Sequence, residues 1–290
     1  MTSRKIGQDR AGRKACPSSL GPTVVPLDLA GSRLDYVLTR LVPGLSLRQA
    51  RRLAESGRAT VDGWPQGKGE VVRAGQVVAL AGKMFSEMDR CKVSLEVAAQ
   101  EQNFAAVVKP AGMHSVRGRG QNSVEGCLDD HFPGLEAVLL NRLDRDTSGL
   151  VLVGFGMETV GQYHEWQDRG EIRKEYLAVV EGQLHAGWTE RRALNTAKRS
   201  KVRVLEHDDP DSLRWTVIEP MRFDPEDGQT LVRAVILKGR RHQIRAHLSA
   251  SGHAIVGDVL YGRGEGKRLF LHHARVTMPG FKAENRPEWG

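Results

Sequence analysis

The sequence of 290 residues predicts an α+β fold, and three features lead to that class. Strand-like apolar runs outnumber helical segments along most of the chain. They do not alternate regularly with helices, as they would in a doubly wound parallel sheet. A short helical region precedes them, and its length suits a small domain in front of a larger one. With 40% apolar residues, the chain can bury a sizeable core.

Charge and composition limit the classes of function. Lysine and arginine outnumber aspartate and glutamate by 43 to 35, a net charge of +8, which favours polyanionic partners such as RNA. Cys16, Cys91 and Cys127 lie far apart and form no Cys-x-x-Cys pair. We therefore expect neither a disulfide framework nor a zinc ribbon, and a cytoplasmic location fits. No apolar run reaches the ~18 residues of a membrane helix, so we expect no membrane span.

The N-terminal segment, residues 1–26, is basic and has no apolar stretch behind it, unlike a secretory signal. We expect it to be a disordered arm. Contact between its basic side chains and RNA is left open, and a solvated tail is the simpler interpretation.

Residues 27–80 are predicted to form a compact module. GSRLDYVLTRL (31–41) has apolar residues at the spacing of one helical face, with Ser32 as its expected cap. LSLRQARRLAESG (45–57) opens with a capping box of Ser46 and Gln49 and ends at Gly57. Short β segments follow at RATVDG (58–63) and VVRAGQVVAL (71–80).

The second of these helices carries Arg48, Arg51 and Arg52 on the side opposite its apolar stripe. A solvated helix face is one interpretation of them. Two helices followed by VDG and a GQVV strand, however, resemble the S4 RNA-binding domain. That resemblance implies that the three arginines contact RNA phosphates, which positions RNA without reading its sequence.

Residues 81–92 are polar and irregular, as expected of a linker, and residues 93–290 form the second predicted domain. Strands are predicted at residues 93–100, 104–109, 175–182, 214–220 and 230–237. Helices are predicted at residues 123–132, 158–170 and 241–252.

The junction NRLDRDTSGL (141–150) lies between two apolar runs. In an extended segment Arg142 and Asp144 project to the same side, and Thr147-Ser148-Gly149 permits a sharp turn. Asp144 would then lie at the rim of a cleft. Taken alone, such a pattern is far more often a surface ion pair or a turn cap than a catalytic centre.

Five motifs occur along the second domain in one order: VVKPAGMHSV (107–116), NRLDRDTSGLVLVG (141–154), KEYLAVVEG (174–182), LKGRRHQIRAHLSASGHAIVGDVLYG (237–262) and LFLHHARV (269–276). Together they resemble the RluA-type pseudouridine synthases. The resemblance implies a central mixed, largely antiparallel sheet with flanking helices. It also implies an isomerase, acting as a monomer in the cytoplasm on uridines of RNA, with large-subunit ribosomal RNA preferred and tRNA as the alternative.

The resemblance implies a role for three residues. After the nucleotide is flipped out, the C1′–N1 bond is broken and C1′ is joined to C5, which requires no cofactor. Asp144 corresponds to the carboxylate that acts as nucleophile or base. Arg245 corresponds to its cationic partner, because a buried carboxylate needs a cation to stay ionised. Tyr176 would stack on the base, although a core tyrosine is the alternative.

Further basic residues are candidates for RNA contact. Arg142 is our candidate for the wedge that fills the gap left by the flipped base, and an ion pair with Asp144 is the alternative. Lys109, Arg240, Arg241 and His242 are expected along the substrate groove, unless they are ordinary surface charges. We expect no metal, because the histidines of this domain lack the spacing of a zinc site.

Some features leave questions open. Asn141 and Phe155 stand where the family usually has histidine and lysine. The sequence also lacks the family's usual final strand and helix motif, so we expect a C-terminal edge without that strand or built differently. An RNA-binding protein without catalysis and a nucleoside glycosylase are competing functions. The covalent route, by attack at C1′, addition at C6 or a glycal, is undecided.

Overall fold

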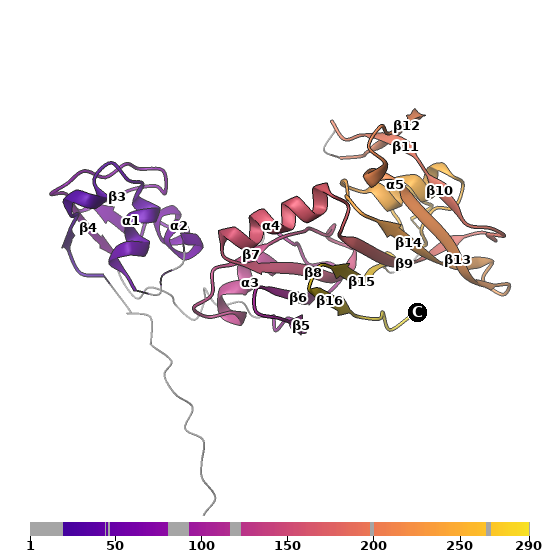
Figure 1. Cartoon of the computed structure of the whole chain (residues 1–290), viewed down its shortest axis with the longest axis horizontal. Coiled ribbons are helices and arrows are strands. Elements are labelled where there is room, and N and C mark those ends of the chain that lie inside the picture. Colours follow the sequence, from indigo (N-terminus) through magenta and orange to yellow (C-terminus); the bar gives the residue numbers. More distant parts are fainter. Residues whose placement is uncertain are drawn as a thin grey trace, which may run out of the picture. The chain divides into compact units, whose positions relative to one another are not determined.

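The computed structural model describes residues 20–43, 45, 47–80, 93–116, 123–197, 200–264 and 268–289. Most of the predicted arm, the capping-box residue Ser46 and the predicted linker lie outside these ranges. The chain divides into two compact units, Met1–Arg90 and Cys91–Gly290, whose elements are labelled in Figure 1.

The first unit combines two helices, α1 (Leu34–Leu41) and α2 (Leu47–Glu55), with a small sheet. The sheet has the strand order β1 (Thr23–Val24), β4 (Val77–Leu80), β2 (Ala59–Val61), β3 (Trp64–Pro65). The apolar stripes of both helices pack with the strands into one core, as their spacing predicted.

Two predictions about this unit are wrong. Residues 20–26 are not all part of an arm: Val24 pairs with Val77 and Val25 is buried, with its N–H bonded to the carbonyl of Gln76 at 2.8 Å. The folded unit therefore begins before residue 27. Ser32 does not cap α1, because the N-cap position is Arg33 and no side chain caps the helix there.

The second unit is built on one large sheet of order β10-β13-β14-β9-β15-β8-β6-β5, with β16 paired to β15 and β7 to β8. All its neighbouring strands are antiparallel except β15 and β8, so the predicted mixed, largely antiparallel sheet is confirmed. A separate pair, β11 and β12, forms a hairpin. The bounds are β5 Glu96–Gln100, β6 Phe104–Lys109, β7 Ala137–Leu139, β8 Ser148–Phe155, β9 Arg173–Glu181, β10 Trp188–Glu190, β11 Arg192–Asn195, β12 Arg203–Asp208, β13 Thr216–Asp224, β14 Gln229–Ile236, β15 Leu271–Met278 and β16 Phe281–Glu284.

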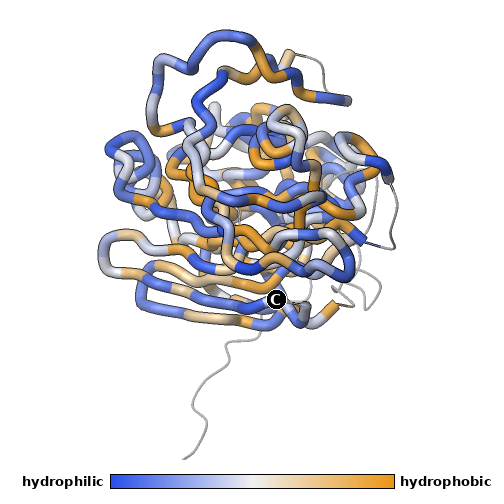
Figure 2. Tube along the Cα trace, turned by 90° about the vertical axis from the view of Figure 1, so that its right-hand side faces the viewer, coloured by the Kyte–Doolittle hydropathy of each residue, from blue (hydrophilic) through white to orange (hydrophobic). Residues whose placement is uncertain are grey.

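Helices cover the sheet on both faces, since successive residues of a strand point to opposite sides. Val151 and Val153 of β8 join a core with α3 (Val124–His131) and α5 (Gln243–Ala250). Leu150 and Leu152 join a second core with Tyr163 of α4 (Met157–Asp168) and with β16. Figure 2 shows apolar (orange) and polar (blue) stretches interspersed along the chain trace. The three predicted helices and the predicted strands of this unit are confirmed.

Three further findings complete the comparison. The expectation of a missing final strand is wrong, because β16 pairs with β15 through Phe281 and Met278. Cys127 is completely buried, and its Sγ lies 3.2 Å from the Ser123 carbonyl. Among the residues described, no helix is long and apolar enough to span a membrane.

Candidate active site

Asp144 lies on an irregular loop between β7 and β8. The loop is held by Leu143, whose N–H and carbonyl both bond to the Ser115 hydroxyl at 2.9 and 2.8 Å. The N–H of Thr147 bonds back to the Asp144 carbonyl at 3.2 Å and closes a turn. We predicted that Arg142 and Asp144 lie at a strand end. This is wrong, because β8 starts only at Ser148 and both residues lie on the loop before it. Because Leu143 is buried, the residues on either side of it, Arg142 and Asp144, point toward the cavity.

We expected Gly149 to permit a sharp backbone turn, but in the structure it permits a close approach of two strands. Its φ is 107°, and a Cβ there would lie 2.4 Å from the His273 carbonyl oxygen. Only glycine therefore lets β8 approach β15 this closely. The approach places the start of β8, and with it the Asp144 loop, against the centre of the sheet.

Arg245 reaches Asp144 from α5. Its NH1 lies 3.1 Å from Asp144 Oδ2, and the side chain of Asp144 is 24% exposed. The pairing predicted between these residues is present in the structure. Burial opposes ionisation of Arg245, but the Asp258 and Asp144 carboxylates raise its pKa.

Asp258 is a site residue that sequence reasoning missed. Its two oxygens accept hydrogen bonds of 2.8 Å from Nε and NH2 of Arg245, and Oδ1 also accepts the N–H groups of Leu260 and Tyr261. These bonds outweigh burial and lower the pKa of Asp258. The GDVLYG motif contained this residue, but nothing in its spacing pointed to Arg245.

His242 also faces Asp144, with Nε2 3.7 Å from Oδ2. Its Nδ1 lies 3.0 Å from the Tyr261 hydroxyl, which accepts the N–H of Val202 at 2.7 Å. The tyrosine proton is thus available to Nδ1, and the imidazole N–H then points from Nε2 toward Asp144. Burial lowers the pKa of His242 more than Asp144 raises it, which favours the neutral ring.

Tyr176 lies on β9 and is 6% exposed. Its ring stacks on His273 of β15, with 4.5 Å between centroids and 15° between planes. The residue is both a core tyrosine and part of a cavity wall, so the two predicted alternatives are not exclusive. Burial, Tyr163 and Asp144 together raise the pKa of Tyr176.

A cavity of about 740 Å³ brings most of the predicted site together. This volume suits a nucleotide-sized ligand. The predicted residues on its wall are Arg142, Asp144, Tyr176, Arg240, Arg241, His242 and Arg245.

Lys109 does not line the groove, so its predicted RNA contact is wrong. The side chain is fully buried, and its ammonium donates to the carbonyls of Pro110, Met113 and Arg145 at 2.8–3.0 Å. Burial lowers its pKa to about 8, while Asp146 and Asp144 act to raise it. Lys109 ties the end of β6 to the Asp144 loop.

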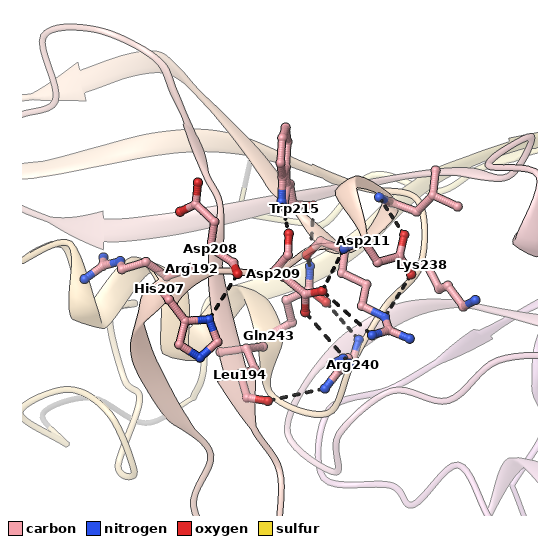
Figure 3. A network of polar contacts seen from close by, with 12 residues as sticks. Arg192, Leu194, His207, Asp208, Asp209, Asp211, Trp215, Lys238, Arg240 and Gln243 are labelled. Atoms are coloured by element: carbon pink, nitrogen blue, oxygen red, sulfur yellow. Dashed lines mark hydrogen bonds and ion pairs between the residues drawn. The ribbon is translucent and has the colours of Figure 1, made fainter.

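Arg240 and Arg241 line the cavity but also have partners within the protein. Figure 3 shows Arg240, which donates to the Leu194 carbonyl at 3.3 Å and lies 3.8 Å from the Asp209 carboxylate. Arg241 donates to the Thr196 carbonyl at 3.1 Å. They are therefore not simple surface charges, because they connect the start of α5 to the β11–β12 hairpin.

Arg142 differs from these two arginines. It is exposed, lines the cavity and forms no hydrogen bond or ion pair with any residue in the described ranges. The alternative of an ion pair between Arg142 and Asp144 is therefore wrong. Asn141 beside it accepts the Leu152 N–H at 2.6 Å, and its buried Nδ2 has no partner among the described residues.

In the first unit, Arg51 donates to Asp35 at 2.9 Å, and this carboxylate is 2% exposed. Part of the charge predicted for RNA thus stabilises the unit itself. Arg48 and Arg52 lie half-buried on the same helix. Within the parts of the chain that the structure describes, no three histidine, cysteine or acidic residues gather as a metal site.

Comparison with solved structures supports the fold. "Human RNA Pseudouridylate Synthase Domain Containing 1" superposes with a TM-score of 0.56 at 22% identity, covering 70% of this chain and 86% of its own. "Human RNA Pseudouridylate Synthase Domain Containing 4" has a TM-score of 0.53 at 17% identity, covering 67% and 89%. The fold is therefore that of a pseudouridylate synthase.

Sequence comparison narrows this class. The profile of the family "RNA pseudouridylate synthase" matches residues 103–250. "Ribosomal large subunit pseudouridine synthase C" of Salmonella typhimurium is 30% identical over 88% of both chains. "Ribosomal large subunit pseudouridine synthase D" of Xanthomonas campestris is 29% identical over 84% of this chain and 76% of its own. The chain belongs to the RNA pseudouridylate synthase family, a family of isomerases, as its motifs predicted.

Proposed function

We propose that this protein isomerises specific uridines of large-subunit ribosomal RNA to pseudouridine, with Asp144 as the reacting carboxylate. The observation that carries the proposal is the 3.1 Å pair of Asp144 and Arg245 inside a nucleotide-sized cavity that also holds Tyr176. The choice of RNA rests on the relatives from Salmonella and Xanthomonas, whose names specify the large ribosomal subunit.

The site offers each group that the isomerisation needs. A carboxylate acts as nucleophile or base, and the Arg245 guanidinium lies 3.1 Å from this one as its cationic partner. His242 Nε2 lies 3.7 Å from the same oxygen and borders the same cavity. Tyr176, backed by His273, provides a fixed aromatic surface on which the flipped uracil can stack while the C1′–N1 bond is broken.

RNA contacts outside the pocket form a second part of the proposal. Arg142 acts as the wedge, because its side chain is exposed at the cavity and has no partner in the described ranges. Arg240 and Arg241 follow the RNA backbone along the same wall. The first unit serves as an S4-like RNA-binding domain through Arg48, Arg51 and Arg52. We place this activity in the cytoplasm, in a monomer.

The test is Asp144→Asn, which keeps the shape of the side chain but removes its charge. We expect unchanged affinity for an unmodified large-subunit RNA transcript and no pseudouridine by chemical mapping. Asp146→Asn, a carboxylate change on the same loop, is the matched control and should remain active. Substantial pseudouridine formation by the Asp144 variant would refute the assignment.

The competing functions give different products. A protein that only binds RNA would leave the transcript unmodified even as wild type. A glycosylase would release free uracil and leave an abasic site, whereas an isomerase releases no base. Chromatography of the nucleotides and of the free bases from one reaction distinguishes all three.

A further inference from the structure

Lys174 is a buried charge on the wall of the same cavity. It lies on β9, two residues before Tyr176, and is 3% exposed. Its ammonium makes one long hydrogen bond, 3.4 Å to the Leu237 carbonyl, and lies 5.9 Å from the centre of the Tyr163 ring. No carboxylate of the described residues lies within ion-pair distance of it.

Lys109 provides an internal comparison. It is equally buried, but its ammonium is satisfied by three carbonyls at 2.8–3.0 Å. Burying an ammonium costs several kcal/mol unless hydrogen bonds or an opposite charge compensate it. Lys174 has much less compensation, since its ammonium makes only one long hydrogen bond, and burial lowers its pKa to about 8. Its ammonium therefore has N–H groups left to donate to a ligand in the cavity.

The position of Lys174 indicates which part of the RNA it meets. Residues two apart on a strand share a face and lie about 6.6 Å apart, close to the width of a pyrimidine. In the register of the sheet, Lys174 lies opposite Ile236, and Tyr176 lies opposite Ala234. A uracil on Tyr176 would therefore turn an edge toward Lys174. The RNA phosphates stay in solvent and would lie near the exposed Arg142. A side chain as buried as Lys174 can meet only the part of the nucleotide that enters the cavity, which is the base.

We propose that Lys174 is a catalytic residue whose ammonium donates a hydrogen bond to a carbonyl oxygen of the uracil and stabilises the negative charge of the departing ring. This inference rests on the proposed function and adds to it a group for the leaving base. Preorganised cations at a developing negative charge are among the largest contributions to catalysis.

The chemistry balances without any further reactant. When the C1′–N1 bond breaks, its electron pair stays with the uracil ring, spread over N1 and the carbonyl oxygens. The ring turns, and an electron pair at C5 forms the new bond to C1′. The C5 proton is released to solvent and N1 takes one up. Lys174 interacts with the ring only while it carries the charge, and keeps its own protons.

The test compares single-turnover rates and affinities on an unmodified large-subunit RNA transcript for the wild type, Lys174→Met and Lys174→Arg. We expect the methionine variant to be slower by about 10²- to 10³-fold, with unchanged affinity, and the arginine variant to recover part of the rate. Lys238→Met, at a half-buried lysine paired with Asp168 outside the cavity wall, is the matched control and should react at the wild-type rate.

Thermal unfolding separates catalysis from structure. Removing an uncompensated buried charge is often neutral or stabilising, so Lys174→Met should not lower the melting temperature. Lys109→Met should lower it, because three carbonyls lose their donor. If Lys174→Met does not fold, Lys174→Gln, which keeps a donor without the charge, gives the same comparison.

The pH dependence provides a further readout. The wild-type rate should fall above about pH 8, where Lys174 loses its proton, whereas the arginine variant stays charged and should keep its rate. The neighbouring groups do not titrate in this range, since burial raises the pKa of Tyr163 and Tyr176 and lowers that of His273 to about 3. Lys109 also has a pKa of about 8, but it titrates in both proteins, so the contribution of Lys174 is the difference between the two pH profiles.

Each outcome decides the matter. Equal rates for Lys174→Met and the wild type would overturn the inference and leave the proposed function intact. A lower melting temperature together with lost RNA affinity would also overturn it, in favour of a structural role. An inactive wild type would remove the proposed function and the inference together.

Discussion

Arg245 is bound more closely to Asp258 than to Asp144. Two of its nitrogens lie 2.8 Å from the Asp258 oxygens, whereas a third lies 3.1 Å from Asp144. Asp258 is completely buried, and Asp144 borders the cavity. The guanidinium is thus oriented by a carboxylate that cannot reach the substrate, which leaves one N–H group directed at the carboxylate that can.

Asp258→Ala should therefore damage both activity and stability. Arg245 would lose the bidentate anchor that orients it, and a misplacement of about 1 Å costs about 10²-fold in rate. The buried guanidinium would lose its two shorter ionic hydrogen bonds and keep only the one to Asp144, which should lower the free energy of unfolding by about 3–5 kcal/mol. Single-turnover kinetics and urea unfolding measure the two effects. Asp258→Asn, which keeps an acceptor for Leu260 and Tyr261, should be milder, and equal effects of both changes would contradict this view.

Arg142→Ala should be selective for RNA structure. The flipped base costs a few kcal/mol in lost stacking, and a wedge offsets that cost only where the base was stacked. We expect a large loss of rate on a uridine in a structured stem-loop and little loss on the same uridine in an unstructured oligonucleotide. Arg145→Ala, an exposed arginine three residues away, is the control. Equal losses on both RNAs would exclude a wedge.

Deleting residues 1–90 should weaken RNA binding and leave the second unit folded. The second unit has its own cores, and the basic first unit is proposed to contact phosphates. Each lost phosphate contact lowers the slope of log affinity against log salt by about 0.7–0.9. Filter binding at several salt concentrations checks this. An unchanged affinity and slope would rule out the S4-like assignment.

Glu190→Gln should reveal a pH-dependent part of the stability. Burial opposes ionisation of Glu190, but hydrogen bonds from Arg192 and Ser251 lower its pKa from the ordinary 4.5 to about 2. A lowered folded-state pKa stabilises the protein above pH 4.5, and this contribution disappears as the pH falls toward 2. The wild type should exceed the variant in urea midpoint at pH 7, by a margin that narrows below pH 4.5. Glu226→Gln, at an exposed position, should show no such trend.

Much of the fold was predictable from local patterns. The helix around Gln243–Ala250 and the strand around Arg173–Glu181 follow from their own apolar spacing. Asp144, Arg245 and Tyr176 were recognised because their motifs have a fixed residue order along the chain. Lys109 was misjudged for the opposite reason: a lysine in a motif looks the same whether its ammonium meets RNA or three backbone carbonyls.

Residue types and their order were enough to predict the α+β class, the two units and the family. These depend on short-range periodicity and on motifs that can be recognised in the sequence alone. Contacts between distant segments were not predictable in this way. Asp258 behind Arg245, Tyr261 behind His242 and the single long hydrogen bond of the buried Lys174 ammonium arise when α5, β9 and the loops around them pack together. Their partners and their exclusion from water depend on that packing, and so do their charge states.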